Sequence, residues 1–215
     1  MARLKTAVLI SGRGTNMQAL LDACAPPDAP AEIVLVISNV AGAGGLDRAA
    51  NAGVPAEIID HREYSGRAAF ERALTERLEH AEVGLVCLAG FMRLLTSGFV
   101  EHWRDRLINI HPSLLPAYKG LDTHARALAD GVRITGCTVH FVRPDMDAGP
   151  IIVQAAVPVH PGDDAESLAA RVLTAEHECY PRALALVASG HARVIDERVE
   201  IDGKVTPENL LINPG

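Results

Sequence analysis

Short β-branched runs alternate along this chain with longer segments that place apolar residues at helical spacing, and this alternation constrains the fold most. The expected strands are residues 6–10, 33–38, 57–59 and 83–88, and the expected helices are 16–24, 46–52 and 67–78. Such alternation favours a parallel sheet with right-handed crossovers and helices on both faces. The first and fourth of these strands are almost wholly apolar, which is typical of strands buried on both sides. The pattern therefore predicts an α/β fold.

The pattern changes after a fifth expected strand at residues 107–110. Further strands are expected at 138–142 and 151–157, but the connection 143–150 is too short for a helical crossover. These two strands should therefore pair antiparallel. The sheet is expected to be mostly parallel with an antiparallel C-terminal portion.

A long helix is expected over residues 164–189. Asp163 or Asp164 should cap its N-terminus, and Pro181 should bend it because proline cannot donate to the helical ladder. Residues 191–215 form a C-terminal tail, in which the turn-favouring pair Asp202-Gly203 predicts a small hairpin.

Composition favours one globular domain over residues 1–215. With 48% hydrophobic residues, a chain of 215 residues can bury one sizeable core. The 20 Lys and Arg are outnumbered by 27 Asp and Glu, which gives a net charge of -7. Because polyanion binding depends on clustered positive charge, this balance disfavours nucleic acid and anionic membranes as partners.

No targeting segment or metal motif stands out. The apolar run Ala7 to Ile10 is shorter than the hydrophobic region of a signal peptide, and no run approaches the ~18 apolar residues of a membrane span. We therefore expect a soluble cytoplasmic protein. The cysteines form no C-x-x-C pair, so neither a metal site nor a disulfide framework is expected. They are Cys24, Cys87, Cys137 and Cys179.

A glycine-rich turn, Ser11-Gly-Arg-Gly-Thr-Asn16, follows the first expected strand and precedes a helix. Ligands of open α/β sheets gather at the carboxyl ends of strands, and the N–H groups of a helix N-terminus attract anions. The turn lacks the third glycine of a dinucleotide motif and the Gly-Lys-Ser/Thr of a P-loop. It is compatible with a site for a single phosphate and with an ordinary strand-to-helix turn.

The end of the fourth expected strand, residues 88–95, is mostly apolar. Gly90 permits close approach of a ligand, and the following side chains suit either a pocket for a flat ring or core packing beneath a loop.

Asn109 and His111 lie two residues apart at the end of the fifth expected strand, so their side chains share one side. The loop that contains Asp145 and Asp147 can supply a carboxylate, which would favour the protonated imidazole. An amide and an imidazolium can stabilise an oxyanion, and the imidazole can move protons. Because no activated Ser or Cys nucleophile lies beside them, the set predicts direct acyl transfer through a tetrahedral intermediate.

Other histidines carry weaker signals. His140 alternates with Val139 and Phe141 and is expected to face the opposite side of its strand, whereas His124 is expected to begin a helix. Five more are expected at the surface or in loops: His61, His80, His102, His160 and His191. No spacing matches a metal-ligand cluster.

Taken together, these motifs resemble the phosphoribosylglycinamide formyltransferases, a family of folate-dependent enzymes of purine biosynthesis. The resemblance covers about residues 5–190 in family order. It is carried by residues 8–16, 37–39, 88–95, 109–116, 136–142, 147–150 and 174–177. The Asn-x-His-Pro-Ser-x-Leu-Pro block and the later Asp-x-Gly-Pro are specific to folate formyltransferases generally, whereas Gly-x-Gly-Thr-Asn favours the glycinamide ribonucleotide branch.

The resemblance implies a three-layer, Rossmann-like formyltransferase fold. Residues 1–105 would form the half that binds the nucleotide phosphate, and residues 106–190 the half that is catalytic and binds folate. His111 would be the general acid and base, Asn109 would hold the formyl oxygen, and Asp147 would adjust the acidity of His111.

The resemblance also implies binding residues. Gly14, Thr15 and Asn16 would hold the phosphate of the ribonucleotide, and Glu176 would approach its ribose or glycinamide portion. The site for 10-formyltetrahydrofolate would be lined by Arg67, Met92, Arg93, Leu94, Leu95 and Asn109. Asp122 stands where some relatives have histidine, so no auxiliary role is carried over to it.

The implied reaction transfers a formyl group from 10-formyltetrahydrofolate to the amine of 5'-phosphoribosylglycinamide, without a metal, in a monomer or homodimer. A tRNA formyltransferase and a formyltetrahydrofolate hydrolase are alternatives, but each normally carries an additional domain for which these 215 residues leave no room. A non-catalytic nucleotide-binding domain is a further alternative. It would leave the combination of Asn109, His111 and Asp147 without a purpose.

Overall fold

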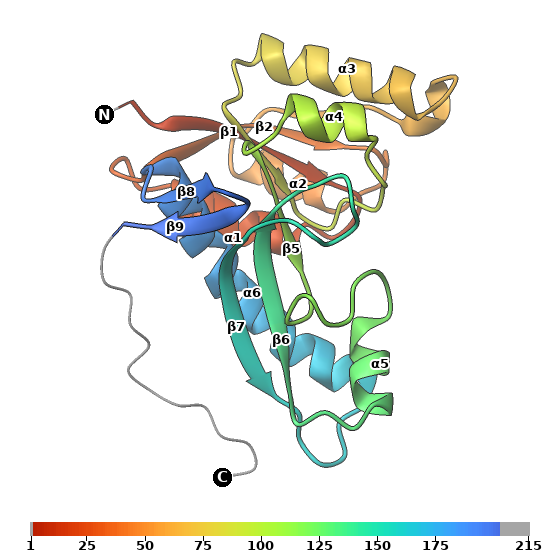
Figure 1. Ribbon diagram of the computed structural model, residues 1–215. Coiled ribbons are helices and arrows are strands. Elements are labelled where there is room, and N and C mark those ends of the chain that lie inside the picture. The colour runs from red at the N-terminus through yellow and green to blue at the C-terminus, as the bar shows by residue number, and fades with distance from the viewer. Residues whose placement is uncertain (1, 203–215) are drawn as a thin grey trace.

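A seven-stranded sheet with helices on both faces organises the chain, and a separate two-stranded sheet follows it (Figure 1). The computed structural model describes residues 2–202. The strand order is β3-β2-β1-β4-β5-β6-β7. These strands are β1 (Leu4–Ile10), β2 (Ala31–Ser38), β3 (Ala56–Ile58), β4 (Leu85–Leu88), β5 (Leu107–His111), β6 (Ile134–Phe141) and β7 (Ile151–Pro158). The predicted α/β fold is confirmed.

The sheet is parallel from β3 to β5 and antiparallel beyond it. Strand β1 pairs parallel with β2 and β4, and β4 pairs parallel with β5. The expected antiparallel pairing of β6 with β7 is confirmed, and β6 also runs antiparallel to β5. This reversal places the end of β6 beside the middle of β5, where Asn109 lies directly opposite His140.

Two apolar layers lie on opposite faces of the sheet, and β1 contributes to both. Val8 and Ile10 point into the layer that contains α1, α2 and α6, whereas Ala7 and Leu9 point into the layer that contains α3 and α4. The helices are α1 (Thr15–Cys24), α2 (Gly45–Asn51), α3 (Arg67–His80), α4 (Ser97–His102), α5 (Thr123–Ala129) and α6 (Ala165–Ala188), with a 3-10 turn, η1 (His61–Glu63). The double-sided burial explains why β1 reads as a continuous apolar run.

Helix α6 begins at a capping box. The Asp164 side chain accepts a hydrogen bond from the Ser167 N–H at 2.8 Å, and the Ser167 hydroxyl accepts one from the Asp164 N–H at 3.0 Å. Of the two expected caps, Asp164 is therefore the one used. Asp163 instead pairs with Arg171 at 2.7 Å, and Pro181 lies within the helix.

A two-stranded hairpin follows α6. Its strands are β8 (Ala192–Ile195) and β9 (Arg198–Ile201), and its turn consists of Asp196 and Glu197, with φ of 47° and 58°. The expected turn at Asp202-Gly203 cannot be compared with this hairpin, because Gly203 lies outside the described residues.

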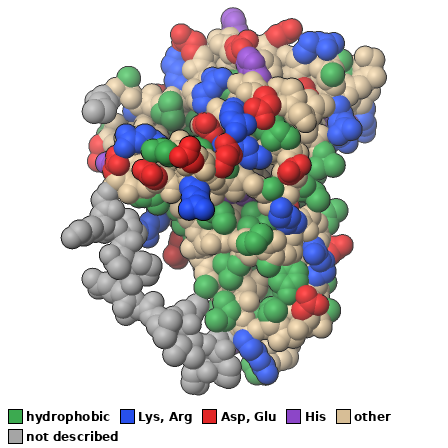
Figure 2. Space-filling model, in the orientation of Figure 1, with side chains coloured by type: hydrophobic (Ala, Val, Ile, Leu, Met, Phe, Trp, Pro, Cys, Tyr) green, Lys and Arg blue, Asp and Glu red, His purple; other side chains and the backbone are tan. Residues whose placement is uncertain are grey.

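The described residues agree with the expectations on cysteines and membrane spans. All four cysteines are free and buried. No helix between residues 2 and 202 combines the length and the apolar character needed to cross a membrane. Figure 2 shows acidic and basic side chains intermixed over β8 and β9, and hydrophobic ones gathered over β6 and β7.

Candidate active site

The predicted catalytic residues meet at the end of β5. Asn109 and His111 belong to β5, and Asp147 lies on the connection between β6 and β7. His111 is 6% exposed, and the Asp147 side chain is 12% exposed. The strand therefore presents both β5 side chains to a loop that begins on the adjacent strand.

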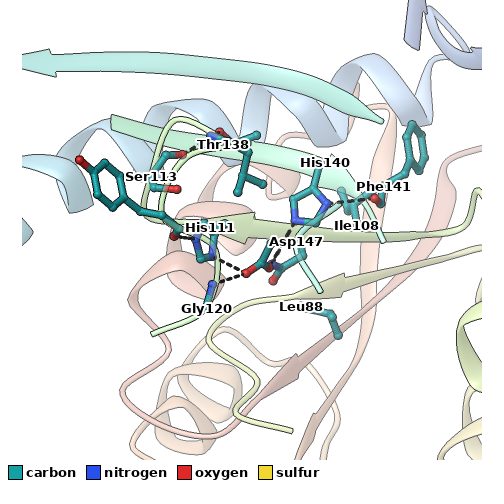
Figure 3. A network of polar contacts seen from close by, with 12 residues as sticks. Leu88, Ile108, His111, Ser113, Gly120, Thr138, His140, Phe141 and Asp147 are labelled. Atoms are coloured by element: carbon teal, nitrogen blue, oxygen red, sulfur yellow. Dashed lines mark hydrogen bonds and ion pairs between the residues drawn. The ribbon is translucent and has the colours of Figure 1, made fainter. Parts of the chain in front are cut away.

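Asp147 lies between two imidazoles (Figure 3). Its Oδ2 atom is 3.4 Å from His111 Nδ1 and accepts a hydrogen bond from the Gly120 N–H at 2.8 Å. Its Oδ1 atom is 4.0 Å from His140 Nε2. The residue has a positive φ of 49°, so its backbone conformation depends on these surroundings.

His140 belongs to the site, although its sequence signal for function was weak. Its side chain faces away from Val139 and Phe141, as expected, and its pairing opposite Asn109 places it on the side of the sheet that carries the catalytic residues. Burial lowers its pKa to about 4, so the ring is neutral at neutral pH. Its Nδ1 atom lies 3.0 Å from the Phe141 carbonyl oxygen and must carry the proton, which leaves Nε2 as an acceptor. Asn109 Nδ2 donates to that atom at 3.4 Å. One N–H of the Asn109 amide is thereby oriented, and the second stays available to a ligand.

His111 faces oxygen atoms on both sides of its ring. Its Nε2 atom lies 2.9 Å from the Tyr118 carbonyl oxygen, opposite the Asp147 contact at Nδ1. The imidazolium form, which has two N–H donors, satisfies both contacts. Tyr118 could not be predicted from the sequence, because a backbone carbonyl carries no residue-specific signal.

His124 is a second histidine that lies near the site, close enough to His111 to be affected by its charge. It is the second residue of α5, close to the predicted helix start, and its Nδ1 atom is buried without a hydrogen-bond partner. Burial is the main cause that lowers its pKa, and the charge of nearby His111 adds to it. Asp122 precedes this helix in a left-handed conformation and does not cap it through its side chain.

The glycine-rich turn ends in a tightly packed helix start. Gly14 precedes α1 with φ of 68°, and a Cβ atom there would lie 2.7 Å from Gly45 Cα. Both the left-handed conformation and the close approach require glycine. Thr15 is the first residue of α1, so its N–H belongs to the positive end of the helix dipole.

Asn16 and Glu176, which the resemblance pairs in one substrate site, are in contact. Asn16 Nδ2 donates to Glu176 Oε2 at 2.7 Å, and Asn16 Oδ1 is buried without a partner. Glu176 is 6% exposed, and burial raises the pKa of its carboxyl while the Asn16 hydrogen bond opposes this effect. A buried acceptor without a donor at a helix N-terminus is suited to a ligand that donates a hydrogen bond.

The apolar stretch after β4 is joined to the glycine-rich turn. The Met92 N–H donates to Ser11 Oγ at 2.8 Å, and the Ser11 hydroxyl donates to Asn39 Oδ1 at 2.6 Å. Met92 and Leu94 are 68% and 64% exposed, respectively.

Arg93 and Leu95 are half-buried, and Arg93 Nε has no hydrogen-bond partner. Arg67 is the exposed first residue of α3. Within the described part of the chain, no hydrogen bond joins Arg67 to this stretch. Two further exposed apolar side chains carry no sequence signal: Met146 lies within the Asp147 loop, and Leu121 lies next to Gly120.

Comparisons with known proteins show the family of this chain. The profile of the family described as Formyl transferase matches residues 4–184. Phosphoribosylglycinamide formyltransferase of Haemophilus influenzae is 42% identical over 209 residues, which cover 97% of this chain and 99% of that protein. Trifunctional purine biosynthetic protein adenosine-3 of Bos taurus is 53% identical over 192 residues, which cover 89% of this chain but only 19% of that protein. The solved structure of glycinamide ribonucleotide transformylase 1 from Symbiobacterium toebii has a TM-score of 0.90 and 49% sequence identity, covering 93% of this chain and 94% of that chain. The chain therefore belongs to the formyl transferase family, and within it to the phosphoribosylglycinamide formyltransferases.

Proposed function

We propose that this chain transfers the formyl group of 10-formyltetrahydrofolate to the amine of 5'-phosphoribosylglycinamide. The products are formylglycinamide ribonucleotide and tetrahydrofolate. The observation that carries the proposal is Asp147 in contact with both His111 and His140, while His140 holds the Asn109 amide. Family membership and the names of the relatives support this choice of reaction.

The reaction needs a proton acceptor, a proton donor and a group that stabilises negative charge. The neutral amine nitrogen attacks the formyl carbon, and the carbonyl oxygen becomes an oxyanion that the free Asn109 N–H and protonated His111 stabilise. The attacking nitrogen then loses a proton while the folate nitrogen gains one, and the bond between the formyl carbon and that nitrogen breaks. His111 exchanges these protons directly or through water, and the Asp147 carboxylate keeps the His111 imidazole in position.

The phosphoribosyl substrate would bind at the start of α1. Gly14, Thr15 and Asn16 offer backbone N–H groups to the phosphate at the positive end of the helix. Glu176 and the unpartnered Asn16 oxygen would accept hydrogen bonds from the ribose or glycinamide portion. With a net charge of -7, the chain depends on such local donors to hold an anion.

The folate would bind against the stretch after β4. Exposed Met92 and Leu94 offer apolar surface to the ring system. Arg93 and Leu95 continue this surface, and the Arg67 guanidinium would pair with the acidic tail. We propose that the reaction needs no metal and that the protein binds no nucleic acid. We also propose that it is located in the cytoplasm and is a monomer or a homodimer.

A formyl-transfer assay with separate acceptors tests the function. The protein is incubated with 10-formyltetrahydrofolate and either glycinamide ribonucleotide, charged tRNA or no acceptor. We expect formylglycinamide ribonucleotide and tetrahydrofolate in equal amounts from the first reaction only. Formate release without an acceptor, or transfer only to tRNA, would overturn the proposal.

His111→Ala tests the catalytic assignment. Loss of the acid and base should lower kcat by about 10²- to 10⁴-fold, because general acid–base catalysis typically contributes that much. Binding of glycinamide ribonucleotide, measured by calorimetry, should stay within about twofold of wild type, since the phosphate site is separate. His160→Ala, at an exposed histidine, is the matched control and should keep wild-type kcat.

A further inference from the structure

The loop that carries Asp147, residues 143–150, is held at both ends. At its exit, the Phe141 N–H donates to the Pro150 carbonyl oxygen at 2.9 Å. Gly149 lies so close to the Phe141 carbonyl that a Cβ atom there would overlap its oxygen. That Cβ atom would also lie 3.3 Å from Arg143 Cγ, so the first side chain of the loop packs against its last turn.

Arg143 is the charged anchor at the entrance of this loop. Its side chain is only 8% exposed. Nε donates to Glu197 Oε2 at 2.6 Å, Nη2 donates to Asp105 Oδ1 at 2.7 Å, and Nη1 donates to the Val142 carbonyl oxygen at 3.1 Å. A planar guanidinium can hold several oxygens in fixed directions at once, which a lysine ammonium does not match.

The two carboxylates come from segments that are distant in sequence. Asp105 precedes β5, the strand of Asn109 and His111, and Glu197 belongs to the turn of the β8–β9 hairpin (Figure 1). Both have a left-handed backbone, with φ of 57° and 58°. Non-glycine residues persist in this conformation where surrounding contacts hold them. Arg143 therefore ties three irregular segments together beside the site.

Ion pairs connect Arg143 to a wider cluster of charged side chains. The hydrogen bond from Arg143 is the largest cause that lowers the pKa of the Glu197 carboxyl, and Arg104 contributes as well. Arg104 also pairs with Glu101 at 2.9 Å, which extends the cluster to α4. The Arg143 side chain is buried, whereas those of Asp105 and Glu197 are 45% and 56% exposed, so loss of a carboxylate would leave the buried guanidinium with fewer partners.

We propose that Arg143 is a positioning residue for the reaction. By joining the Asp147 loop to Asp105 and Glu197, it fixes the Asp147 carboxylate against His111 and makes the C-terminal hairpin part of the catalytic support. The proposal rests on the proposed function, because Asp147 acts there through His111. A displaced carboxylate would slow the chemical step and leave both substrate sites in place.

Steady-state kinetics of four variants test the proposal. Arg143→Met keeps the packing of the side-chain stem and removes the charge, and should lower kcat about tenfold, because misplacement by about 1 Å can cost as much as 10²-fold. KM for both substrates should stay within about twofold of wild type. Arg143→Lys should be intermediate, and Glu197→Ala should lower kcat about threefold. Asp196→Ala is the matched control, because Asp196 is the neighbouring exposed turn residue with φ of 47° and should keep wild-type kcat.

The double variant adds a second readout. If both residues act through one contact, Arg143→Met with Glu197→Ala should be no slower than Arg143→Met alone. Thermal unfolding verifies that each variant is folded at the assay temperature. If Arg143→Met does not fold, Glu197→Ala is compared with Asp196→Ala instead. The proposal then requires that Glu197→Ala lowers kcat about threefold while Asp196→Ala keeps wild-type kcat.

Two failures can be told apart. A wild-type protein that does not formylate glycinamide ribonucleotide would overturn the proposed function itself. An active wild type whose Arg143 and Glu197 variants keep kcat within about twofold, whatever their loss of stability, would overturn the role of Arg143.

Discussion

Glu176 combines a functional position with an unfavourable environment. Its carboxyl is 6% exposed and receives one hydrogen bond, from Asn16. Burial raises its pKa, which means that the folded chain holds the proton of Glu176 more tightly than the unfolded chain. The charged form therefore costs stability at neutral pH, as is common for residues that are selected for binding.

Glu176→Gln should make the protein more stable and less active. The glutamine keeps a carbonyl oxygen for Asn16 but carries no charge, so the free energy of unfolding at about pH 8 should rise by roughly 1 kcal/mol. The gain should shrink as the pH falls, because the native carboxyl becomes protonated below its raised pKa. Urea unfolding of both proteins at about pH 5 and pH 8 measures this. A variant that is less stable at pH 8, or fully active, would contradict the expectation.

Single residues of the site differ in how far the sequence predicts them. Asn109 and His111 share a side because residues two apart in a strand point the same way. The position of His140 beside the catalytic residues depends on its register opposite Asn109 in the β5–β6 pairing. Strand register is set by long-range pairing, so alternation within one strand could not give it.

At the scale of elements, α6 links the two halves of the site. Its residue Glu176 meets α1 through Asn16, and its residue Tyr180 reaches the sheet. The Tyr180 hydroxyl is fully buried and lies 2.9 Å from the Leu88 carbonyl oxygen and 3.2 Å from that of Ile108. One hydroxyl thereby fixes the helix to the strands that precede the folate stretch and the catalytic residues.

Tyr180→Phe should loosen this link without creating a cavity. The ring stays in place, but the buried carbonyls lose their shared donor, which costs about 1 to 3 kcal/mol of unfolding free energy. Denaturant unfolding checks the expectation. Tyr64→Phe, at a half-buried tyrosine, is the control and should change stability by less than about 0.5 kcal/mol. Equal stability of Tyr180→Phe and wild type would show that the hydrogen bond contributes nothing.

Most strands and helices were predictable, including the short β3 and α2, whereas α4 and the position of the hairpin turn were not. Strand β1 carries a continuous apolar run because both of its faces are buried, and helix α3 places buried apolar residues at helical spacing. Helix α4 is too short for periodicity, and its only signal is the Thr96 cap, which accepts from the Phe99 N–H. The hairpin turn has neither glycine nor asparagine, although Asp196 and Glu197 are both left-handed, and Glu197 pairs with Arg104 and Arg143. Such pairs join distant segments and leave no local pattern.

The whole molecule should lose stability below about pH 6.5, and histidines should be the cause. Burial lowers the pKa of His140 to about 4 and also lowers the pKa values of His124 and His177. The unfolded chain binds protons at these groups at about pH 6.5, whereas the folded chain binds them only at lower pH. The stability they provide is therefore complete above about pH 6.5 and lost as the pH falls. Glu176 has the opposite sign, and Asp60, with a pKa lowered to about 2, matters only in stronger acid.

His140→Gln isolates the largest of these contributions. The pKa of His140 is about 4, against about 6.5 for an ordinary histidine, and this difference corresponds to about 3 kcal/mol of unfolding free energy. The wild-type protein should lose this stability between about pH 7 and pH 4. The variant should be less stable at pH 7, because it loses the neutral imidazole between Asn109 and Phe141, yet its unfolding free energy should fall less steeply with acid. Urea titrations in steps across this range give both slopes, and His160→Gln, at an exposed site, should follow wild type. Parallel curves for wild type and His140→Gln would mean that His140 is not held neutral by burial, and the orientation of Asn109 through an accepting Nε2 would lose its basis.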